Sequence, residues 1–144
     1  MRHYPDNPIV AVGVVVIRRF ETGPRVLLIK RGKAPRAGTW SIPGGRQRLG
    51  ETLEAAARRE VYEETGLELA GLRLLDVIDS ITRDDDGAIS YHYSLIDFAA
   101  NWAAGEARAA SDAAAVCWAD PHDLAPYSLW SETRRLIGVA VTGG

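Results

Sequence analysis

The sequence predicts an α/β fold, an α/β/α sandwich in which helices cover a mixed β-sheet. The segment 9–19 is rich in Val and Ile, which is typical of a strand. Residues 52–65 carry apolar positions at helical spacing and are followed by Gly66, a residue that commonly ends a helix. Strand patterns then return, and a second helical pattern follows near the end of the chain. This alternation predicts a sheet with helices packed on it.

The remaining elements follow from local signals. Proline, glycine and acidic clusters separate the apolar segments and mark turns, most clearly the three aspartates before Gly87. The alanine-rich stretch 99–110 is expected to be a loop, and Pro121 is expected to open a short helical turn. Ser131 is the expected N-cap of a final helix over 131–139. The expected strands are residues 9–19, 25–31, 40–43, 67–82, 88–98 and 113–119.

Composition favours a single domain over residues 1–144, because the chain is long enough for a core and has an ordinary 47% hydrophobic and 25% charged content. The formal net charge of −2 gives no electrostatic basis for nonspecific binding to nucleic acids or membranes. The longest apolar run, residues 9–17, is shorter than the roughly 18 residues of a membrane span. The first eight residues lack the apolar segment of a signal peptide. We therefore expect a cytoplasmic protein.

An acidic cluster marks the end of the first helix. Glu60, Glu63 and Glu64 occupy positions i, i+3 and i+4 and so share one face. Like charges at this spacing destabilise a helix, and the macrodipole disfavours negative charge in the last turn. Bound Mg²⁺ or Mn²⁺ would supply the missing counter-charge, because hard cations prefer oxygen ligands. The alternative is a solvated acidic face that Arg58 and Arg59 partly neutralise.

The approach to this helix is also unusual. Pro43 is followed by Gly44 and Gly45, which predicts a strand end that breaks into a tight loop. Glycine lets the main chain come close to an ion or a phosphate. Placed upstream of three glutamates, the loop forms the second half of a candidate site.

Residues 45–67 match the Nudix box, G-x5-E-x7-R-E-U-x-E-E-x-G-U, in which U is aliphatic. The chain therefore resembles the Nudix hydrolase family, and most closely the small bacterial members grouped with ADP-ribose pyrophosphatases. The flanking GTWSIPGG and YHYSLIDF segments support this resemblance. The fixed positions are filled by Gly45, Glu51, Arg59, Glu60, Val61, Glu63, Glu64, Gly66 and Leu67.

The resemblance implies the Nudix fold and a Mg²⁺-dependent hydrolase, with Mn²⁺ as a further option. Such an enzyme cleaves the pyrophosphate bond of a nucleoside diphosphate linked to another moiety. The resemblance also implies that Glu60, Glu63, Glu64 and the Gly44 carbonyl bind the metal. It further implies a Glu51–Arg59 pair that organises the loop together with Gly45 and Gly66. The candidate catalytic residues are Arg59, Glu60, Glu63 and Asp112.

Asp112 enters this set because of a departure from the family pattern. Many relatives carry a further acidic residue in the loop after the long strand, and position 115 is alanine here. Asp112 and Glu106 are the acidic residues left in that region, and an ordinary loop carboxylate is the better interpretation of Glu106.

The substrate stays open at this point. ADP-ribose or a related nucleotide sugar is the first expectation, and an oxidised nucleoside triphosphate is the alternative within the same fold. A non-catalytic nucleotide-sensing module is a third hypothesis, which the intact box disfavours. The candidate substrate contacts are Arg31, Arg83, Tyr91 and Tyr93. A homodimer is a further option.

Overall fold

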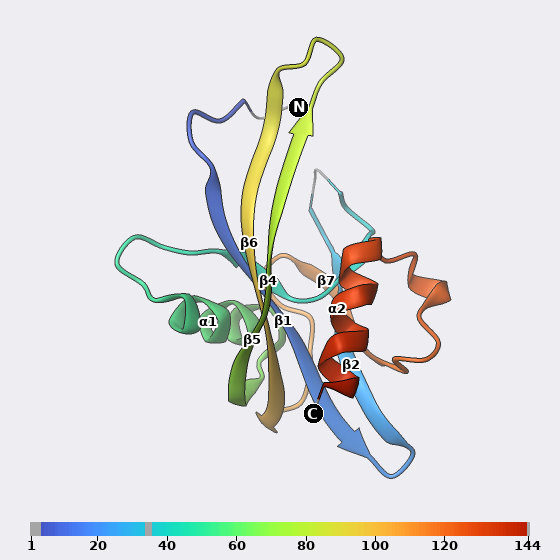
Figure 1. The fold of residues 1–144 in the computed structure, drawn as a ribbon. Coiled ribbons are helices and arrows are strands. Elements are labelled where there is room, and N and C mark those ends of the chain that lie inside the picture. The colour runs from blue at the N-terminus through green and yellow to red at the C-terminus, as the bar shows by residue number, and fades with distance from the viewer. Residues whose placement is uncertain (1–3, 34–35, 144) are drawn as a thin grey trace.

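The computed structural model shows a mixed sheet with one helix on each face, which confirms the α/β sandwich (Figure 1). It describes residues 4–33 and 36–143, so parts of the N-terminal segment and of the basic loop at 32–38 lie outside the described residues. The elements are β1 (Ile9–Phe20), β2 (Gly23–Arg31), β3 (Trp40–Ser41), β4 (Gly44–Arg46), α1 (Leu53–Thr65), β5 (Glu68–Arg83), β6 (Ile89–Ala104), β7 (Ala113–Ala119), a 3₁₀ turn (Ala125–Tyr127) and α2 (Ser131–Thr142).

Strand β1 lies at the centre of the sheet and organises the site. The strand order is β3-β2-β1-β6-β5, with β4 paired to β1 and β7 paired to β2. Strands β1 and β6 run parallel, whereas the other pairs are antiparallel. On the edge away from β6, β1 pairs first with β4 and further along with β2. Where the two partners diverge, the Val14 N–H donates to the Pro43 carbonyl at 3.0 Å, which holds the Pro43–Gly44 segment against the sheet.

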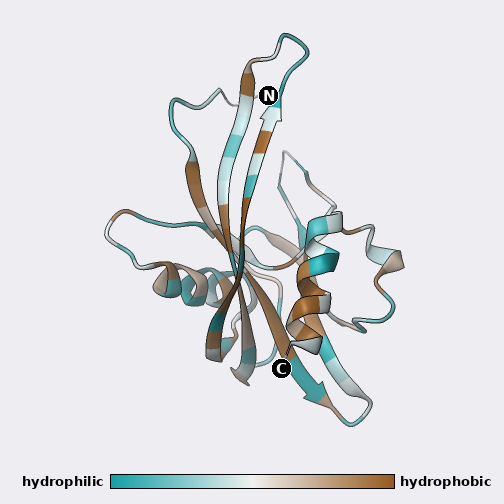
Figure 2. Cartoon of the chain, in the orientation of Figure 1, coloured by the Kyte–Doolittle hydropathy of each residue, from teal (hydrophilic) through white to brown (hydrophobic). Residues whose placement is uncertain are grey.

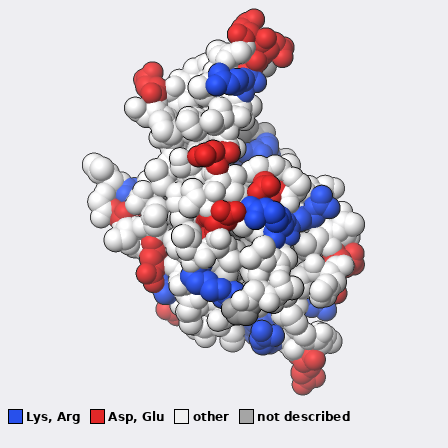
Figure 3. All heavy atoms as spheres, viewed as in Figure 1, with Lys and Arg blue, Asp and Glu red and all other residues white. Residues whose placement is uncertain are grey.

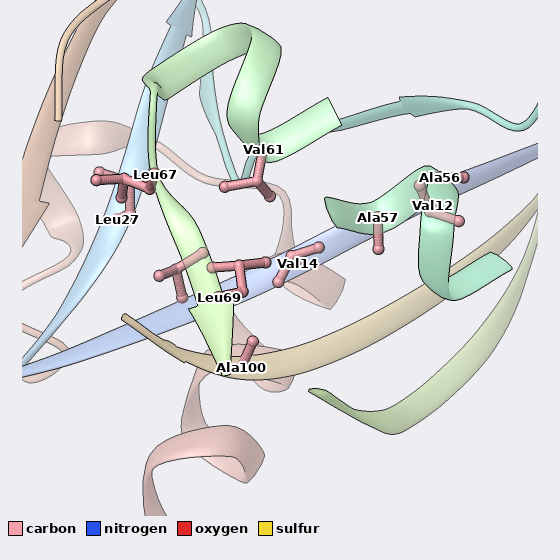
Figure 4. Packing of buried hydrophobic residues seen from close by; sticks show 10 residues of the cluster. Val12, Val14, Leu27, Ala56, Ala57, Val61, Leu67, Leu69 and Ala100 are labelled. Atoms are coloured by element: carbon pink, nitrogen blue, oxygen red, sulfur yellow. The ribbon is translucent and has the colours of Figure 1, made fainter. Parts of the chain in front are cut away.

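The alternation of side chains along β1 builds a core on both faces. Val12 and Val14 face α1, and Val15 and Ile17 face α2. Figure 2 shows the hydrophobic colour continuing along β1 and over one side of each helix. Figure 4 shows the α1 side, where the buried residues are Val12, Val14, Val16, Leu27, Ala56, Ala57, Val61, Leu67, Leu69 and Ala100. This packing fixes the helix that carries the glutamates to the strand that holds Gly44.

Strand β6 corrects one expectation. It continues to Ala104, so the prediction of a loop over 99–110 was wrong for its first six residues. Ala99 and Ala100 are fully buried, because small side chains fit where both helices approach the sheet. Pairing with β5 on one edge and β1 on the other supplies the hydrogen bonds, and this tertiary context overrides the weak strand propensity of alanine.

Three boundaries also differ from the sequence predictions. Trp130, and not Ser131, holds the N-cap position of α2, and it makes no side-chain capping bond. The short helical turn lies at Ala125–Tyr127 rather than at Pro121. The strand expected at 40–43 contains only Trp40–Ser41, since Pro43 has no N–H to donate to a ladder.

No helix in the described part of the chain is long and apolar enough to cross a membrane. On the face shown in Figure 3, basic and acidic side chains are interspersed. That face therefore offers no continuous basic field for a nucleic-acid backbone, in agreement with the net charge of −2.

Candidate active site

Helix α1 has the ends that the sequence predicts. The Thr52 hydroxyl accepts a hydrogen bond from the Ala55 N–H at 3.1 Å, which satisfies a free donor of the first turn. Gly66 ends the helix in the left-handed region at φ 77°, and its N–H donates to the Tyr62 carbonyl at 2.8 Å. Ala56 and Ala57 are buried against the sheet, and the glutamates follow one to two turns later. The helix thus leads from the core to the loop at Gly44.

Arg59 connects the loop to the helix. Its Nε and Nη2 donate to the two carboxylate oxygens of Glu51 at 2.6 and 3.0 Å, and Nη2 also donates to the Arg46 carbonyl at 3.0 Å. Its Nη1 donates to Glu60 at 2.8 Å and to Glu63 at 2.7 Å. These hydrogen bonds hold the pKa of Glu51 down at about 2 and raise the pKa of Arg59. One guanidinium therefore orders three carboxylates and the loop backbone.

Glu60 lies directly beneath the glycine loop. A Cβ atom at Gly45 would lie 2.5 and 2.7 Å from the two Glu60 carboxylate oxygens. Only glycine leaves room for this carboxylate, which explains the residue type at position 45. Burial raises the pKa of Glu60, and the nearby Glu63 charge raises it further.

Glu64 contacts the same loop one residue earlier, at Gly44. Its side chain is 6% exposed, and its Oε1 accepts a hydrogen bond from the Gly44 N–H at 2.9 Å. Burial raises its pKa to about 7, and the charges of Glu60 and Asp112 act in the same direction. The expectation of three carboxylates on one face needs this refinement, because Glu60 and Glu63 turn toward Arg59 while Glu64 turns toward Gly44.

The donor set fits a divalent cation. Among the described residues, no three Asp, Glu, His or Cys side chains converge into a ready metal cluster. Nevertheless, Glu60, Glu63 and Glu64 are hard oxygen donors, and Glu60 and Glu64 lie directly against the Gly44–Gly45 backbone. The alternative of an acidic face that Arg58 and Arg59 neutralise holds only in part. Arg59 contacts two of these glutamates, but Arg58 binds Glu54 at 3.2 Å and the Leu69 carbonyl at 2.6 Å instead.

Addition of Mg²⁺ is expected to raise the melting temperature of the protein. A ligand that binds only the native state stabilises it by RT ln(1 + [L]/Kd), about 2.7 kcal/mol at 100 times Kd. The measurement is a thermal scan with increasing MgCl₂, with NaCl at equal ionic strength as the control. Equal curves in the two salts would contradict a specific cation site.

The acidic residues of the loop before β7 lie in different surroundings. Asp112 binds Lys33 at 2.9 Å, and its charge contributes to the raised pKa of Glu64, so it lies on the box side of the molecule. Glu106 is 88% exposed and lies 3.8 Å from Arg18. The structure therefore brings Asp112, and not Glu106, toward the box carboxylates.

Of the candidate substrate contacts, Arg31 lies nearest to the box. Its charge opposes the raised pKa of Glu64, and its Nε is enclosed without a hydrogen-bond partner among the described residues. Tyr91 and Tyr93 stack with centroids 6.5 Å apart and planes at 15°. Arg83 donates to the Gly87 carbonyl at 3.1 Å near the tip of the β5–β6 hairpin. The structure does not bring Arg83 together with the box carboxylates.

A family comparison identifies this arrangement. The model of the NUDIX domain matches residues 7–138. The chain belongs to the Nudix family. As a Nudix hydrolase it acts on phosphoric anhydride bonds of nucleotide derivatives, and members of this family generally use a divalent metal.

Two relatives differ in the substrate their names record. A proposed 8-oxo-dGTP diphosphatase from Mycobacterium tuberculosis is 38% identical over 122 residues, covering 82% of this chain and 79% of the relative. An ADP-ribose pyrophosphatase from Methanocaldococcus jannaschii is 39% identical over 107 residues, covering 74% of this chain and 59% of the relative. Sequence identity therefore does not separate the two substrate classes for this Nudix hydrolase.

Solved structures confirm the fold. A MutT NUDIX hydrolase from Burkholderia pseudomallei superimposes with a TM-score of 0.76 at 32% identity, covering 92% of this chain and 98% of the other. The NUDIX domain of Shewanella oneidensis NrtR, solved with ADP ribose, gives a TM-score of 0.78 at 22% identity, covering 94% and 88%. At this identity, the second likeness shows the fold alone.

The sequence reasoning missed one polar residue. Asp97 on β6 is 5% exposed and lies on the side of the sheet that faces α2. Two signals in the sequence mark the position: an aspartate within an apolar strand, and Gly13 alone within a run of aliphatic residues. The reason for this pair emerges only from the register, which places the two residues side by side on β6 and β1.

Proposed function

We propose that this Nudix hydrolase cleaves the diphosphate of ADP-ribose or a related nucleotide sugar, releasing a nucleoside monophosphate and a phosphorylated sugar. The observation that carries the hydrolase assignment is the complete box, in which Arg59 orders Glu51, Glu60 and Glu63 beside the glycine loop. The substrate proposal is supported by the 39% identity to an ADP-ribose pyrophosphatase.

In this proposal the box residues hold Mg²⁺, with Mn²⁺ as the alternative ion. Glu60, Glu63, Glu64 and the Gly44 carbonyl are the ligands. The cation would neutralise the diphosphate and lower the pKa of the attacking water. Phosphoryl transfer depends mainly on positioning and charge stabilisation, so the chain itself contributes a prearranged set of oxygens.

The residues around the ligands have separate tasks. Arg59 holds Glu60 and Glu63 in place through its Nη1. Arg31 lies on the side of Glu64 and offers a guanidinium for a substrate phosphate. Asp112 is the proposed acidic group outside the box helix, and its carboxylate would accept a proton from the attacking water.

Nucleoside triphosphate hydrolysis is the second candidate, because a proposed 8-oxo-dGTP diphosphatase is also 38% identical. The deciding experiment is a substrate panel with Mg²⁺ that contains ADP-ribose, other nucleotide sugars, dinucleoside polyphosphates, NADH and nucleoside triphosphates including 8-oxo-dGTP. Products are identified by chromatography. The highest kcat/KM for 8-oxo-dGTP would replace the first proposal by the second, and binding without turnover of any compound would favour a sensing module.

Asp112→Asn is expected to lower kcat by about 100-fold with little change in KM, because general-base catalysis contributes about 10²–10⁴-fold and the substitution keeps the volume. Steady-state kinetics on the best substrate of the panel measures this. Glu106→Gln is the matched control and should change kcat little, since Glu106 lies in solvent. If both variants keep native kcat, the box carboxylates suffice without a carboxylate from this loop.

A further inference from the structure

An unusual glycine in β1 makes room for a carboxyl group. Gly13 interrupts a strand of aliphatic residues at the centre of the sheet, where glycine weakens a strand. A Cβ atom at this position would lie 2.5 Å from Oδ1 of Asp97 and 3.1 Å from Cδ1 of Ile42. The missing side chain therefore creates the space that the Asp97 carboxyl fills.

Asp97 has no hydrogen bond or ion pair within the described part of the protein, although it is 95% buried. Its charged surroundings are Asp76 on β5 and Arg135 on α2, which bind each other at 2.7 Å. Burial raises the pKa of Asp97 to about 6, the Asp76 charge adds to this effect, and Arg135 opposes it. An unpaired buried carboxyl destabilises the native state. A partner that arrives with a ligand would explain why the fold keeps it.

The carboxyl group remains open to such a partner. Arg31 Nε is the one polar side-chain atom of the described residues that is both fully enclosed and unpaired. The oxygens of Asp97 are unpaired but not fully enclosed, so they keep a small contact with solvent. A hydrogen-bond donor of a ligand lying on this face of the sheet could therefore contact them.

The register places Asp97 at a defined distance from the box. Asp97 pairs with Gly13, and Gly13 pairs with Gly44 on the other edge of β1. Adjacent strands lie about 4.8 Å apart, so the Asp97 and Gly44 backbones are roughly 10 Å apart across the sheet. A nucleotide whose phosphates lie at Gly44 can bridge this separation with its nucleoside.

The neighbours of Asp97 suit a nucleobase. Alternate residues of a strand share a face, so Tyr91, Tyr93 and Asp97 lie on the same side of β6. The two tyrosine rings are nearly parallel, and aromatic rings of this kind stack on bases. The β5–β6 hairpin extends beyond the two helices (Figure 1), and both tyrosines lie partly exposed near the start of β6.

We propose that Asp97 recognises the amino group of an adenine base in the bound nucleotide, and so acts as a specificity-determining residue. This inference rests on the proposed nucleotide substrate. Its carboxyl oxygen accepts a hydrogen bond from the exocyclic N–H, and in the protonated form its O–H donates to the neighbouring ring nitrogen. An unpaired buried acceptor discriminates strongly between ligands with and without the matching donor.

The test is calorimetric titration of AMP, purine riboside 5′-monophosphate and ribose 5-phosphate in Mg²⁺, which needs no turnover. Purine riboside 5′-monophosphate has a hydrogen atom in place of the amino group and is otherwise identical to AMP. The native protein should bind AMP at least tenfold more tightly than this analogue, because the analogue cannot donate to the Asp97 carboxyl. Asp97→Ala should remove this preference and leave the affinity for ribose 5-phosphate unchanged.

Asp97→Asn is the second variant. An asparagine amide can accept from the amino group and donate to the ring nitrogen, so it should fold with native volume and keep the preference for AMP. Equal affinity of the native protein for AMP and purine riboside 5′-monophosphate, or absence of AMP binding, would overturn the inference. An Asp97→Ala variant that weakens all three ligands equally would also overturn it.

The outcome is separable from that of the proposed function. If ADP-ribose is not hydrolysed but AMP is still preferred through Asp97, only the substrate proposal fails. If ADP-ribose is hydrolysed and the native protein does not distinguish AMP from purine riboside 5′-monophosphate, only the role of Asp97 fails.

Discussion

Glu64→Gln is expected to lower kcat by about 100-fold or more while stabilising the metal-free protein at neutral and alkaline pH. The loss of activity follows from removing a charged oxygen from the proposed metal site, since a bound cation contributes several kcal/mol to the stabilisation of transition-state charge and each 1.36 kcal/mol is tenfold in rate. The fold should persist, because glutamine Oε1 can still accept the hydrogen bond from the Gly44 N–H.

The expected gain in stability of the Glu64→Gln variant follows from the raised pKa of Glu64 in the native protein. Glu64 has an ordinary value of 4.5 and a value of about 7 in the folded protein. Between these two values the folded state binds more protons than the unfolded state, so native stability falls as the pH rises from about 4.5 to about 7 and stays lowered above it. A pKa change of this size corresponds to about 3 kcal/mol, and the neutral glutamine does not carry this cost.

Thermal unfolding in EDTA at pH 4.5 and pH 8, together with kinetics in Mg²⁺, measures both effects. The stabilisation should appear at pH 8 and be small at pH 4.5. Glu54→Gln is the matched control, because Glu54 lies on the same helix and pairs with Arg58 at 3.2 Å, away from the glycine loop. Near-native kcat for Glu64→Gln would show that the metal assignment is wrong, and near-native kcat for Glu63→Gln as well would rule out the site.

The sequence predicts those parts of the site that depend on local geometry. Thr52 and the first six residues of α1 separate Glu51 from Arg59, and the resemblance to the Nudix box predicted that the two residues pair. Thr52 and Gly66 were predictable as helix ends, because capping depends on a few consecutive residues. The directions of Glu60 and Glu64 were not, since they depend on where Gly44 and Gly45 lie on β1.

In the fold, too, local features were predictable from the sequence and long-range features were not. The strands rich in Val and Ile were predictable from composition, whereas the extension of β6 through Ala104 was not, because alanine carries no strand signal and the pairing partners lie far away in the sequence. Asp97 and Gly13 are 84 residues apart, and only the parallel register brings them together. Long-range pairing of this kind leaves little trace in a single sequence.

Arg59→Lys is expected to lower kcat/KM by about 10- to 100-fold, which is the usual effect of losing a group that orients metal ligands. The substitution keeps the positive charge but loses the planar fork. The guanidinium makes two parallel hydrogen bonds to Glu51 and, at the same time, bonds to Glu60 and Glu63. A lysine ammonium cannot span these positions, so Glu60 and Glu63 should lose their fixed orientation.

The matched control is Arg58→Lys on the next position of the helix, where the side chain binds Glu54 and the Leu69 carbonyl outside the site. A double-mutant cycle with Glu51→Gln separates structure from charge. If Arg59 acts by organising the loop, the effects of Arg59→Lys and Glu51→Gln should be strongly non-additive, because each removes the same bidentate pair. Additive effects would place Arg59 directly on the substrate, and unchanged kinetics in Arg59→Lys would show that charge alone, without the fork, holds the carboxylates in place.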